Sequence, residues 1–348
     1  MKTKAAILVQ QKKPLVITDI EVPALKAHQV LVRIEAAGVC GSQIGEIDGV
    51  KGPDRFLPHL LGHEAGAVVV ETGPGVKKVK AGDHVVLHWK PSAGRDAATP
   101  VYRWGRRRVN AGRVTAFQEL SVVSENRVTR IPRNVPFTTA ALYGCALLTA
   151  WGVVTRDARL KRGESLLVLG AGTLGLSEIM FAKMIGASPI IAVDLYAGKL
   201  RVAKELGATH VIHSRTQNTH RLIQRDLKGR TLDVVFENTG RRDVIELGYE
   251  LCGPKGRTIL VGVPGYREKA SIDTLPLHFG KALTGSFGGD ARPDKDIPYL
   301  LSCQRKKAFD PTSLLSEPYS LDRINDAILD LRRGRVIRPV IACQTGGG

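Results

Sequence analysis

Apolar and polar positions alternate along the first 145 residues in the way that is typical of β-strands. The clearest runs are QVLVRIEAAGV (29–39), AGAVVVETG (65–73) and GDHVVLH (82–88), and glycine and proline residues punctuate the chain around them. A period of two residues turns one side of each strand toward a core, while Gly and Pro mark turns. We therefore predict that this part of the chain is built mainly from β-strands.

From about residue 147 the pattern changes to short apolar runs that alternate with stretches of helical period. The runs expected as buried strands are SLLVLG (165–170), IIAVD (190–194), THVIH (209–213), LDVVFENTG (232–240) and GRTILVGVP (256–264). The helices expected between them include LGLSEIMFAKMIGA (174–187) and AGKLRVAKELGA (197–208). Strands and helices that alternate at this spacing predict a parallel, doubly wound sheet.

The residues after 286 return to mixed structure, in which LDRINDAILDLRRG (321–334) predicts an amphipathic helix. No internal repeat and no low-complexity linker separates the parts of the chain. The expected fold class is α/β, with a Rossmann-like domain (147–286) inserted into a second domain that consists of residues 1–146 plus 287–348.

A glycine-rich motif of the form G-x-G-x-x-G lies between the strand at 165–170 and the helix that follows it. Its residues are Gly170, Gly172, Thr173, Leu174 and Gly175, with Ala171 inside the motif. The glycines allow a tight turn and close approach of a pyrophosphate to the helix N-terminus. The alternative is a purely structural strand–helix turn, but the complete alternation of strands and helices favours dinucleotide binding.

The next strand ends in Asp194, 19 residues after Gly175, where a carboxylate can bind both ribose hydroxyls. A carboxylate in this place repels a 2′-phosphate, so the sequence predicts NAD(H) rather than NADP(H). Lys199, on the following helix, is expected to reach the adenosine ribose.

Cys40, His63 and Cys145 together form a candidate metal site. Two thiolates and one imidazole are a typical ligand set for catalytic zinc, with a fourth position open for water or substrate. Taken singly, each of the three residues is as readily explained as an ordinary core side chain. Their spacing along the sequence does not decide between these interpretations.

The chain resembles the medium-chain dehydrogenase/reductase superfamily, in its zinc-dependent alcohol dehydrogenase branch, over nearly all its length. The matching segments are GVCGSQ, LLGHEAGAVVVETGPGVKKVKAGDHVV, YGCALLTAWGVV, LGAGTLGLSEIM, VDLYAGKLRVAKELGA, FENTG, VGVP, SFGGDARPDKDIP and GRVIRPV. The resemblance implies a GroES-like, mostly-β catalytic domain around the Rossmann domain. The last sixty or so residues look closest to the formaldehyde-linked, class III subgroup.

The resemblance also implies roles for single residues. Cys40, His63 and Cys145 match the catalytic zinc ligands, Glu64 matches a glutamate that approaches the metal in some members, and Ser42 matches the hydroxyl that takes the substrate proton. The positions that match the nicotinamide lining and a basic group near the pyrophosphate are Thr149, Val263, Phe287 and Arg338.

Three departures from the family pattern concern the metal and its surroundings. No cysteine lies between Cys40 and Cys145, so we expect one catalytic zinc per chain and no structural zinc. Gln43 stands where most relatives have an aspartate beside the zinc-bound histidine; its amide can still hydrogen-bond the imidazole but supports zinc less strongly. Gly45 stands where some relatives have a relay histidine.

A basic segment, KPSAGRDAATPVYRWGRRRVNAGR (90–113), replaces the lobe that binds structural zinc in relatives. It is interpreted either as a clamp for an anionic substrate or as a solvated loop or subunit contact, and the second interpretation is favoured.

Composition limits the partners and the compartment. The chain has 51 Lys plus Arg against 33 Asp plus Glu, a net charge of +18, and this field attracts anions in general. No apolar run is long enough for a membrane span. Five scattered cysteines suit a reducing compartment, and the N-terminus does not read as a signal peptide, so a cytoplasmic location is expected. By analogy with relatives, we expect a homo-oligomer, a dimer or a tetramer.

The function predicted from these features is hydride transfer between NAD(H) and a small-molecule alcohol or its carbonyl counterpart. The expected substrate is a secondary, polyol-like or sugar-like alcohol, anionic ones included; a formaldehyde adduct is a narrower version. The alternatives are a zinc-free reductase of the same superfamily and a basic NAD-binding protein that associates with nucleic acid. The three retained ligands and the low aromatic content of 5% argue against these two, and no specific nucleic-acid partner is expected.

Overall fold

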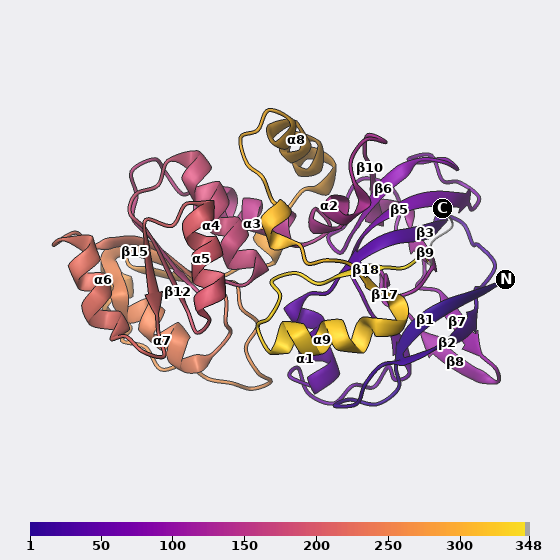
Figure 1. The fold of residues 1–348 in the computed structure, drawn as a ribbon, viewed down its shortest axis with the longest axis horizontal. Helices are drawn as coiled ribbons and strands as arrows, with labels where there is room; N and C mark the ends of the chain where they lie inside the picture. The colour runs from indigo at the N-terminus through magenta and orange to yellow at the C-terminus, as the bar shows by residue number, and fades with distance from the viewer. Residues whose placement is uncertain (345–348) are drawn as a thin grey trace. The chain divides into compact units, whose positions relative to one another are not determined.

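The computed structural model describes residues 1–344, which fall into two compact units (Figure 1). The first unit contains Met1–Leu148, Arg292–Ser302 and the chain from Leu314 onward, and the second contains Thr149–Ala291 and Cys303–Ser313. Among the described residues, no helix has the length and apolar character needed to cross a membrane.

The first unit is built mainly from strands, as the alternating pattern predicts. The strands are β1 (Lys2–Leu8), β2 (Val16–Glu21), β3 (Gln29–Gly38), β4 (His59–Leu60), β5 (Glu64–Thr72), β6 (His84–His88), β7 (Val101–Trp104), β8 (Arg107–Asn110), β9 (Leu120–Ser124), β10 (Val128–Arg130), β17 (Tyr319–Ser320) and β18 (Val340–Ala342). The strands β1-β2-β7-β8-β4 close into a small barrel. The others form a sheet in the order β10-β6-β5-β3-β18-β17, with β9 also paired to β3.

Helices of this unit cover the sheet and begin or end close to its strands. They are α1 (Gly41–Asp48), α2 (Phe137–Leu142), α9 (Ile324–Arg332) and the larger part of α8 (Pro293–Arg305), with the short helices η1 (Glu125–Arg127) and η6 (Leu321–Arg323) and the last residue of η5 (Thr312–Leu314). The core includes side chains from the central strands, such as Val32, Ile34, Val69 and Leu87, all at most 2% exposed. The amphipathic helix predicted at 321–334 is confirmed by α9, which adds Ile324, Ala327 and Ile328 to that core.

The second unit is a six-stranded parallel sheet, and the prediction of a doubly wound sheet is confirmed. Its order is β13-β12-β11-β14-β15-β16, so the chain leaves β11 first toward one edge and later toward the other. The strands are β11 (Leu166–Leu169), β12 (Ile190–Asp194), β13 (His210–His213), β14 (Leu232–Glu237), β15 (Cys252–Leu260) and β16 (Ala282–Gly285). The helices are α3 (Ala146–Gly152, which begins in the first unit), η2 (Val153–Asp157), α4 (Thr173–Ile185), α5 (Ala197–Leu206), α6 (Thr219–Leu227), α7 (Arg242–Leu251), η3 (Leu275–Phe279) and η4 (Gly288–Asp290).

One boundary in this unit differs clearly from the sequence prediction. β15 begins at Cys252, four residues before the predicted start at Gly256. The early part of the strand contains Gly253, Pro254 and Gly256, which are uncommon inside strands, and its pairing with β14 shifts register between Leu232 and Val234. Local sequence preference therefore points to a turn where pairing with β14 imposes an extended chain.

The basic segment 90–113 divides into an anchored stretch and a β-hairpin of the barrel. The hairpin is β7–β8, and its exposed residues are Arg103, Arg106, Arg107 and Arg108. Before it, the buried Glu125 accepts hydrogen bonds from the backbone N–H of Arg95 at 2.9 Å and of Lys77 at 3.1 Å. Further along, Asp96 forms an ion pair with Arg113. Side-chain anchors of this kind fix the loop to the sheet.

The carboxyl of Glu125 allows a test of how this loop is fixed, because burial and hydrogen bonding act on its pKa in opposite directions. Burial alone raises the pKa of this carboxyl, but the backbone N–H groups of Arg95, Lys77 and Lys78 outweigh burial and the net pKa is lowered. A carboxyl with a lowered folded-state pKa stabilises the fold above its unfolded pKa, near 4.3, and loses this contribution as the pH falls through the folded value.

We therefore expect Glu125→Gln to lower the free energy of unfolding by about 1–3 kcal/mol at neutral pH. The difference from the unsubstituted protein should shrink below about pH 4, where Glu125 itself becomes protonated. Urea unfolding at several pH values measures both effects. Glu71→Gln, on an exposed position of β5, is the control and should change stability by less than about 0.5 kcal/mol. A constant difference from pH 7 to pH 3 contradicts the proposed role of the charge.

Candidate functional site

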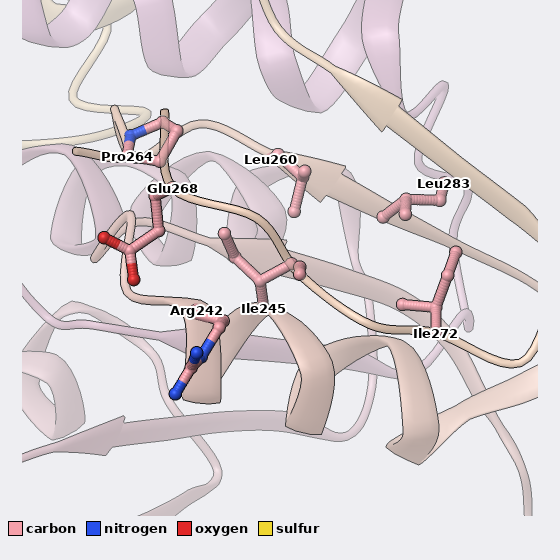
Figure 2. Close-up of a pocket in the computed structure, with 8 residues that line it drawn as sticks. Arg242, Ile245, Leu260, Pro264, Glu268, Ile272 and Leu283 are labelled. Atoms are coloured by element: carbon pink, nitrogen blue, oxygen red, sulfur yellow. The ribbon is translucent and has the colours of Figure 1, made fainter. Parts of the chain in front are cut away.

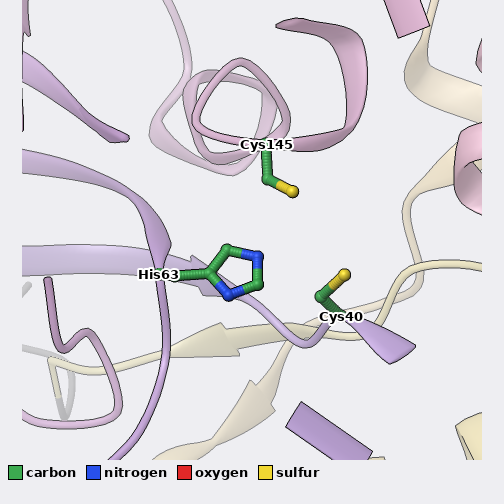
Figure 3. Close-up of side chains that lie close together, drawn as sticks. All are labelled: Cys40, His63 and Cys145. Carbon is green, nitrogen blue, oxygen red and sulfur yellow. The ribbon is translucent and has the colours of Figure 1, made fainter. Parts of the chain in front are cut away.

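Cys40, His63 and Cys145 come from three separate parts of the chain and meet in the first unit. Cys40 is the residue before α1 and lies two residues after the end of β3; His63 precedes β5; Cys145 lies between α2 and α3. Their ligand atoms all lie within 4.8 Å of one another (Figure 3). In residues 1–344, no other group of three His, Cys, Asp or Glu side chains is close enough to bind a metal ion.

A glycine allows the segment with Cys145 to approach the strands. A Cβ atom on Gly144 would lie 2.2 Å from the carbonyl oxygen of Leu87 and 2.6 Å from Cβ of Glu64, distances that no larger residue tolerates. Tetrahedral zinc with bonds of about 2.0–2.3 Å needs ligand atoms roughly 3.3–3.8 Å apart. The three atoms therefore need only small movements to bind one ion.

Hydrogen bonding orients His63 within this cluster. The side-chain amide of Gln43 contacts Nδ1 of His63, while its oxygen accepts a hydrogen bond from the backbone N–H of Cys40 at 2.9 Å. The other ring nitrogen, Nε2, points toward the space between the two sulphur atoms (Figure 3) and is buried without a hydrogen-bond partner among the described residues. An unpartnered nitrogen facing two sulphurs suits a metal ligand.

The two cysteines differ in their affinity for protons. The hydrogen bond from Cys145 lowers the pKa of Cys40 well below its usual value, although burial opposes this, and the charge of Arg338 also lowers it. The pKa of Cys145 is correspondingly raised well above its usual value by its hydrogen bond to Cys40 and by burial. For His63, burial lowers the pKa, but the neighbouring Cys40 outweighs burial and raises it. Cys40 is thus the more acidic of the two thiols.

Glu64 and Arg338 form a buried ion pair beside the ligands. Nε of Arg338 lies 3.3 Å from Oε1 of Glu64, and both side chains are at most 3% exposed. Nη1 of Arg338 also donates to the carbonyl oxygen of Val39, at 3.0 Å. Burial raises the pKa of the Glu64 carboxyl, and the Arg338 guanidinium opposes this rise.

The predicted cofactor residues of the second unit gather at the carboxyl edge of its sheet. Gly170 follows β11, Asp194 ends β12, Val263 follows β15 and Phe287 follows β16. Since these strands are parallel, their carboxyl ends lie at the same edge, where open α/β sheets bind ligands. Val263 and Phe287 are 54% and 74% exposed there. Thr149 belongs to α3, and its buried hydroxyl has no hydrogen-bond partner in the described part of the chain.

The glycine motif has the geometry that its sequence predicts. Gly170 has φ of +95°, a left-handed conformation, and Gly172 is the residue before α4, of which Thr173 and Leu174 are the first residues. A Cβ atom on Gly175 would lie 2.1 Å from the carbonyl oxygen of Gly170, so only glycine allows the helix this close to the loop. The N-terminus of α4 therefore lies directly against this loop, the arrangement in which a helix N-terminus can bind a pyrophosphate.

Asp194 connects the end of β12 to this loop. Its Oδ2 accepts from the backbone N–H of Ala171 at 2.8 Å, and its Oδ1 accepts from that of Tyr196 at 2.9 Å. Lys199 lies on the first turn of α5, with its ammonium group 4.8 Å from the centre of the Tyr196 ring, and the guanidinium carbon of Arg215 lies 5.7 Å from the same ring. Nothing in the sequence pattern predicted that Tyr196 and Arg215 would join this group.

Sequence reasoning also missed a buried acidic group behind the glycine motif. Glu178, on α4, is fully buried and accepts a hydrogen bond from the Asn238 amide at 2.7 Å. Burial raises the pKa of Glu178 to about 8, against the effect of that hydrogen bond. Its position inside an apolar helical run gave the only available signal, since a carboxylate in such a run needs a partner.

A cavity of about 220 Å³ lies in the second unit, and none of the predicted site residues lines it (Figure 2). Its walls come from α7, the end of β15, the loop after it and β16, and they are mostly apolar. Arg242 and Glu268 lie at one end, while Ile245, Leu260 and Leu283 line the rest (Figure 2).

Two family models match the chain, one in each part of the sequence. The Alcohol dehydrogenase GroES-like domain matches residues 26–133, and the Zinc-binding dehydrogenase model matches residues 173–303. The first match confirms the GroES-like fold expected for the strand-rich part of the chain.

Solved structures resemble the chain over nearly its full length. An alcohol dehydrogenase zinc-binding domain protein from Burkholderia ambifaria is 28% identical, with a TM-score of 0.90, over 99% of this chain and 100% of that one. The benzyl alcohol dehydrogenase of Acinetobacter calcoaceticus is 27% identical, with a TM-score of 0.89 and the same coverage. An alcohol dehydrogenase of Aeropyrum pernix is 26% identical, with a TM-score of 0.81, over 97% of this chain and 99% of that one.

The buried ion pair of Glu64 and Arg338 predicts how substitutions at these two residues change the stability of the fold. Arg338→Met leaves the Glu64 carboxylate buried without a counter-charge, so we expect unfolding in the presence of a chelator to require about 3–5 kcal/mol less free energy. Adding Glu64→Gln to that variant removes the unpaired charge and should recover part of the loss. Urea unfolding measures the cycle. A single substitution that costs less than 1 kcal/mol, or a double variant no better than the single one, contradicts the pairing.

Proposed function

We propose that this protein transfers a hydride between NAD(H) and an alcohol or the matching carbonyl compound. The chain belongs to the medium-chain dehydrogenase/reductase superfamily, in its zinc-dependent alcohol dehydrogenase branch. The proposal includes one catalytic zinc ion, bound by Cys40, His63 and Cys145. The observation that supports it most directly is the convergence of these three ligand atoms within 4.8 Å.

The residues present fit a zinc ion. Two sulphurs and an imidazole nitrogen are preferred zinc ligands, and Nε2 of His63 is buried facing the sulphurs with no partner in the described structure. The lowered pKa of Cys40 supports a thiolate, the form that binds metal. When bound, zinc supplies a Lewis acid for the alcohol or carbonyl oxygen, and NAD supplies the hydride acceptor.

The side chains around the ligands have proposed roles of their own. Ser42 lies in the first turn of α1, two residues after Cys40, and its buried hydroxyl has no hydrogen-bond partner among residues 1–344. We propose that its Oγ relays the proton that the substrate hydroxyl loses, giving up its own proton to water or to the cofactor ribose. Glu64 is the additional group proposed to approach the metal, and Arg338 balances the negative charge of Glu64 and Cys40. An approach of Arg338 to the cofactor pyrophosphate, implied by the family resemblance, remains a proposal.

The second unit is proposed to bind NAD(H) at the carboxyl edge of its sheet. The motif Gly170, Gly172, Thr173, Leu174, Gly175 would contact the pyrophosphate, and Asp194 with Lys199 would contact the adenosine ribose. Asp194 contacts the loop by accepting a hydrogen bond from the N–H of Ala171, and this same carboxylate is proposed to bind the ribose. Thr149, Val263 and Phe287 are the proposed contacts of the nicotinamide.

The substrate is proposed to be a small alcohol, secondary or polyol-like, or the matching ketone or aldehyde. The net charge of +18 favours anionic members of this class by attraction. Benzyl alcohol belongs in the first substrate panel, because one similar structure is a benzyl alcohol dehydrogenase.

The proposal extends to the domains, the location and the oligomeric state of the protein. We propose that residues 1–146 plus 287–348 act as the catalytic domain and 147–286 as the cofactor domain. We further propose a cytoplasmic homo-oligomer without structural zinc.

Zinc content tests the metal site. We expect about one zinc per chain in protein that has been loaded with excess Zn²⁺ and then freed of unbound ions. Cys145→Ser should remove the zinc and reduce alcohol oxidation by at least about 100-fold, because a ligand contributes more than an outer partner. NADH binding, followed by fluorescence, should persist. Cys303→Ser is the matched control outside the site and should change neither quantity. Full activity of Cys145→Ser refutes the assignment, and two zinc ions per chain refute the expected absence of structural zinc.

Cofactor preference tests Asp194. Asp194→Gly removes the carboxylate that is proposed to accept hydrogen bonds from the ribose hydroxyls, so we expect the Kd for NADH to rise by roughly 10–100-fold. The Kd for NADPH should rise less or fall, because repulsion of the 2′-phosphate disappears. Asp194→Asn keeps a hydrogen-bonding group without the charge and should shift the preference less far in the same direction. Titration of both cofactors measures the ratio; an unchanged ratio in both variants contradicts the ribose role.

A further inference from the structure

The side-chain amide of Gln43 lies between two of the proposed metal ligands, Cys40 and His63. Gln43 is 1% exposed and occupies the third position of α1. Its oxygen accepts from the backbone N–H of Cys40, and its nitrogen contacts Nδ1 of His63. One amide therefore hydrogen-bonds the backbone of one ligand and the ring of another.

An amide has an acceptor at one end and a donor at the other, and this polarity decides where His63 has its proton. The oxygen of Gln43 is used by the N–H of Cys40, so the NH₂ group faces Nδ1 of His63. An NH₂ group only donates, and Nδ1 must then be the unprotonated, accepting nitrogen. The single proton of a neutral His63 consequently lies on Nε2, the nitrogen that faces the two sulphurs (Figure 3).

Metal binding requires the opposite arrangement. A histidine that binds through Nε2 donates a lone pair there and has its proton on Nδ1, usually toward a carboxylate or a carbonyl oxygen. With the proton on Nδ1, His63 points an N–H at the NH₂ group of Gln43. Rotating the amide by half a turn relieves this contact but points the NH₂ group at the N–H of Cys40.

Neither orientation of Gln43 satisfies both neighbours once a metal is bound. The N–H of Cys40 and the Nδ1–H of His63 are both donors, whereas the two ends of the amide offer one acceptor. Because Gln43 is buried, one of these two N–H groups has no acceptor, and its lost hydration is a free-energy cost to metal binding. Without metal, in contrast, the N–H of Cys40, both ends of the Gln43 amide and Nδ1 of His63 each face a complementary group.

We propose that Gln43 is a positioning residue that favours the metal-free form of His63 and makes the zinc of this site exchangeable. The inference rests on the proposed function, since it assumes that zinc binds Cys40, His63 and Cys145. Its consequence is an enzyme whose active fraction follows the concentration of available zinc.

The substitution that tests this is Gln43→Glu, which changes one NH₂ group into an oxygen at nearly the same shape. A carboxylate accepts from both N–H groups, so the conflict disappears only in the metal-bound form. We expect the Kd for Zn²⁺, measured by competition with a chromophoric chelator at one neutral pH, to fall by about 10–100-fold. The rate at which excess chelator removes zinc should fall with it.

Two comparisons separate hydrogen-bond polarity from added charge and from misfolding. Gln217→Glu adds the same charge in the second unit, where the side-chain oxygen accepts from the N–H of His213, and it should leave the zinc Kd unchanged. Nitrogen-15 NMR of the zinc-free protein reports the proton position directly. The unsubstituted protein should show His63 protonated on Nε2, and Gln43→Glu should show a proton on Nδ1.

The outcomes distinguish this inference from the proposed function. Zinc bound by the unsubstituted protein with the same Kd as by Gln43→Glu, within about twofold, overturns the role of Gln43 and leaves the zinc site intact. A proton on Nδ1 in the zinc-free, unsubstituted protein also overturns it, even if the variant fails to fold. Absence of zinc binding in both proteins overturns the proposed function together with the inference.

Discussion

The first unit depends on one buried cation, the guanidinium of Arg338. Around it lie the buried carboxylate of Glu64 and the sulphurs of Cys40 and Cys145, two residues that are half-buried. Such a group of acidic side chains is tolerated only when a positive charge neutralises part of it, because the cost of burying unpaired charge amounts to several kcal/mol. Arg338 supplies this charge before any metal binds, and its second bond, to the carbonyl of Val39, fixes it beside the strand that leads into Cys40.

Strand pairing explains how residues so distant in sequence reach this point. β18 pairs antiparallel with β3, with Val340 opposite Gly38, and the N–H of Val39 donates to the carbonyl of Pro339. The same strand β3 pairs with β5, which begins directly after His63. A central strand with partners on both sides therefore fixes two ligands and the balancing cation, while α2 and Gly144 fix the approach of Cys145.

Much of the fold can be predicted from the sequence, because burial of strands and helices leaves a characteristic pattern of apolar residues. The apolar runs at 165–170 and 190–194 have no polar face, and both proved to be central strands of a parallel sheet. The metal set was predictable as a group only through resemblance, since nothing in the spacing of Cys40, His63 and Cys145 tells that they meet. The ion pair of Arg338 with Glu64 was not predicted, because it depends on the pairing of β18 with β3. The early start of β15 was missed because long-range pairing overrode the local signals of Gly253 and Pro254.

Gln43 shows a further limit of reasoning from residue type. The sequence predicted that its amide could still contact the histidine, and the contact with His63 is present. What the type of residue does not reveal is that the other end of the amide is already bound to the backbone of Cys40, which fixes the direction in which it donates. The direction of the hydrogen bond between Gln43 and His63 is therefore determined by both contacts of the amide together and not by either one alone. A site can thus contain all three residues that a metal needs and still be tuned, by one buried amide, toward the state in which the metal is absent.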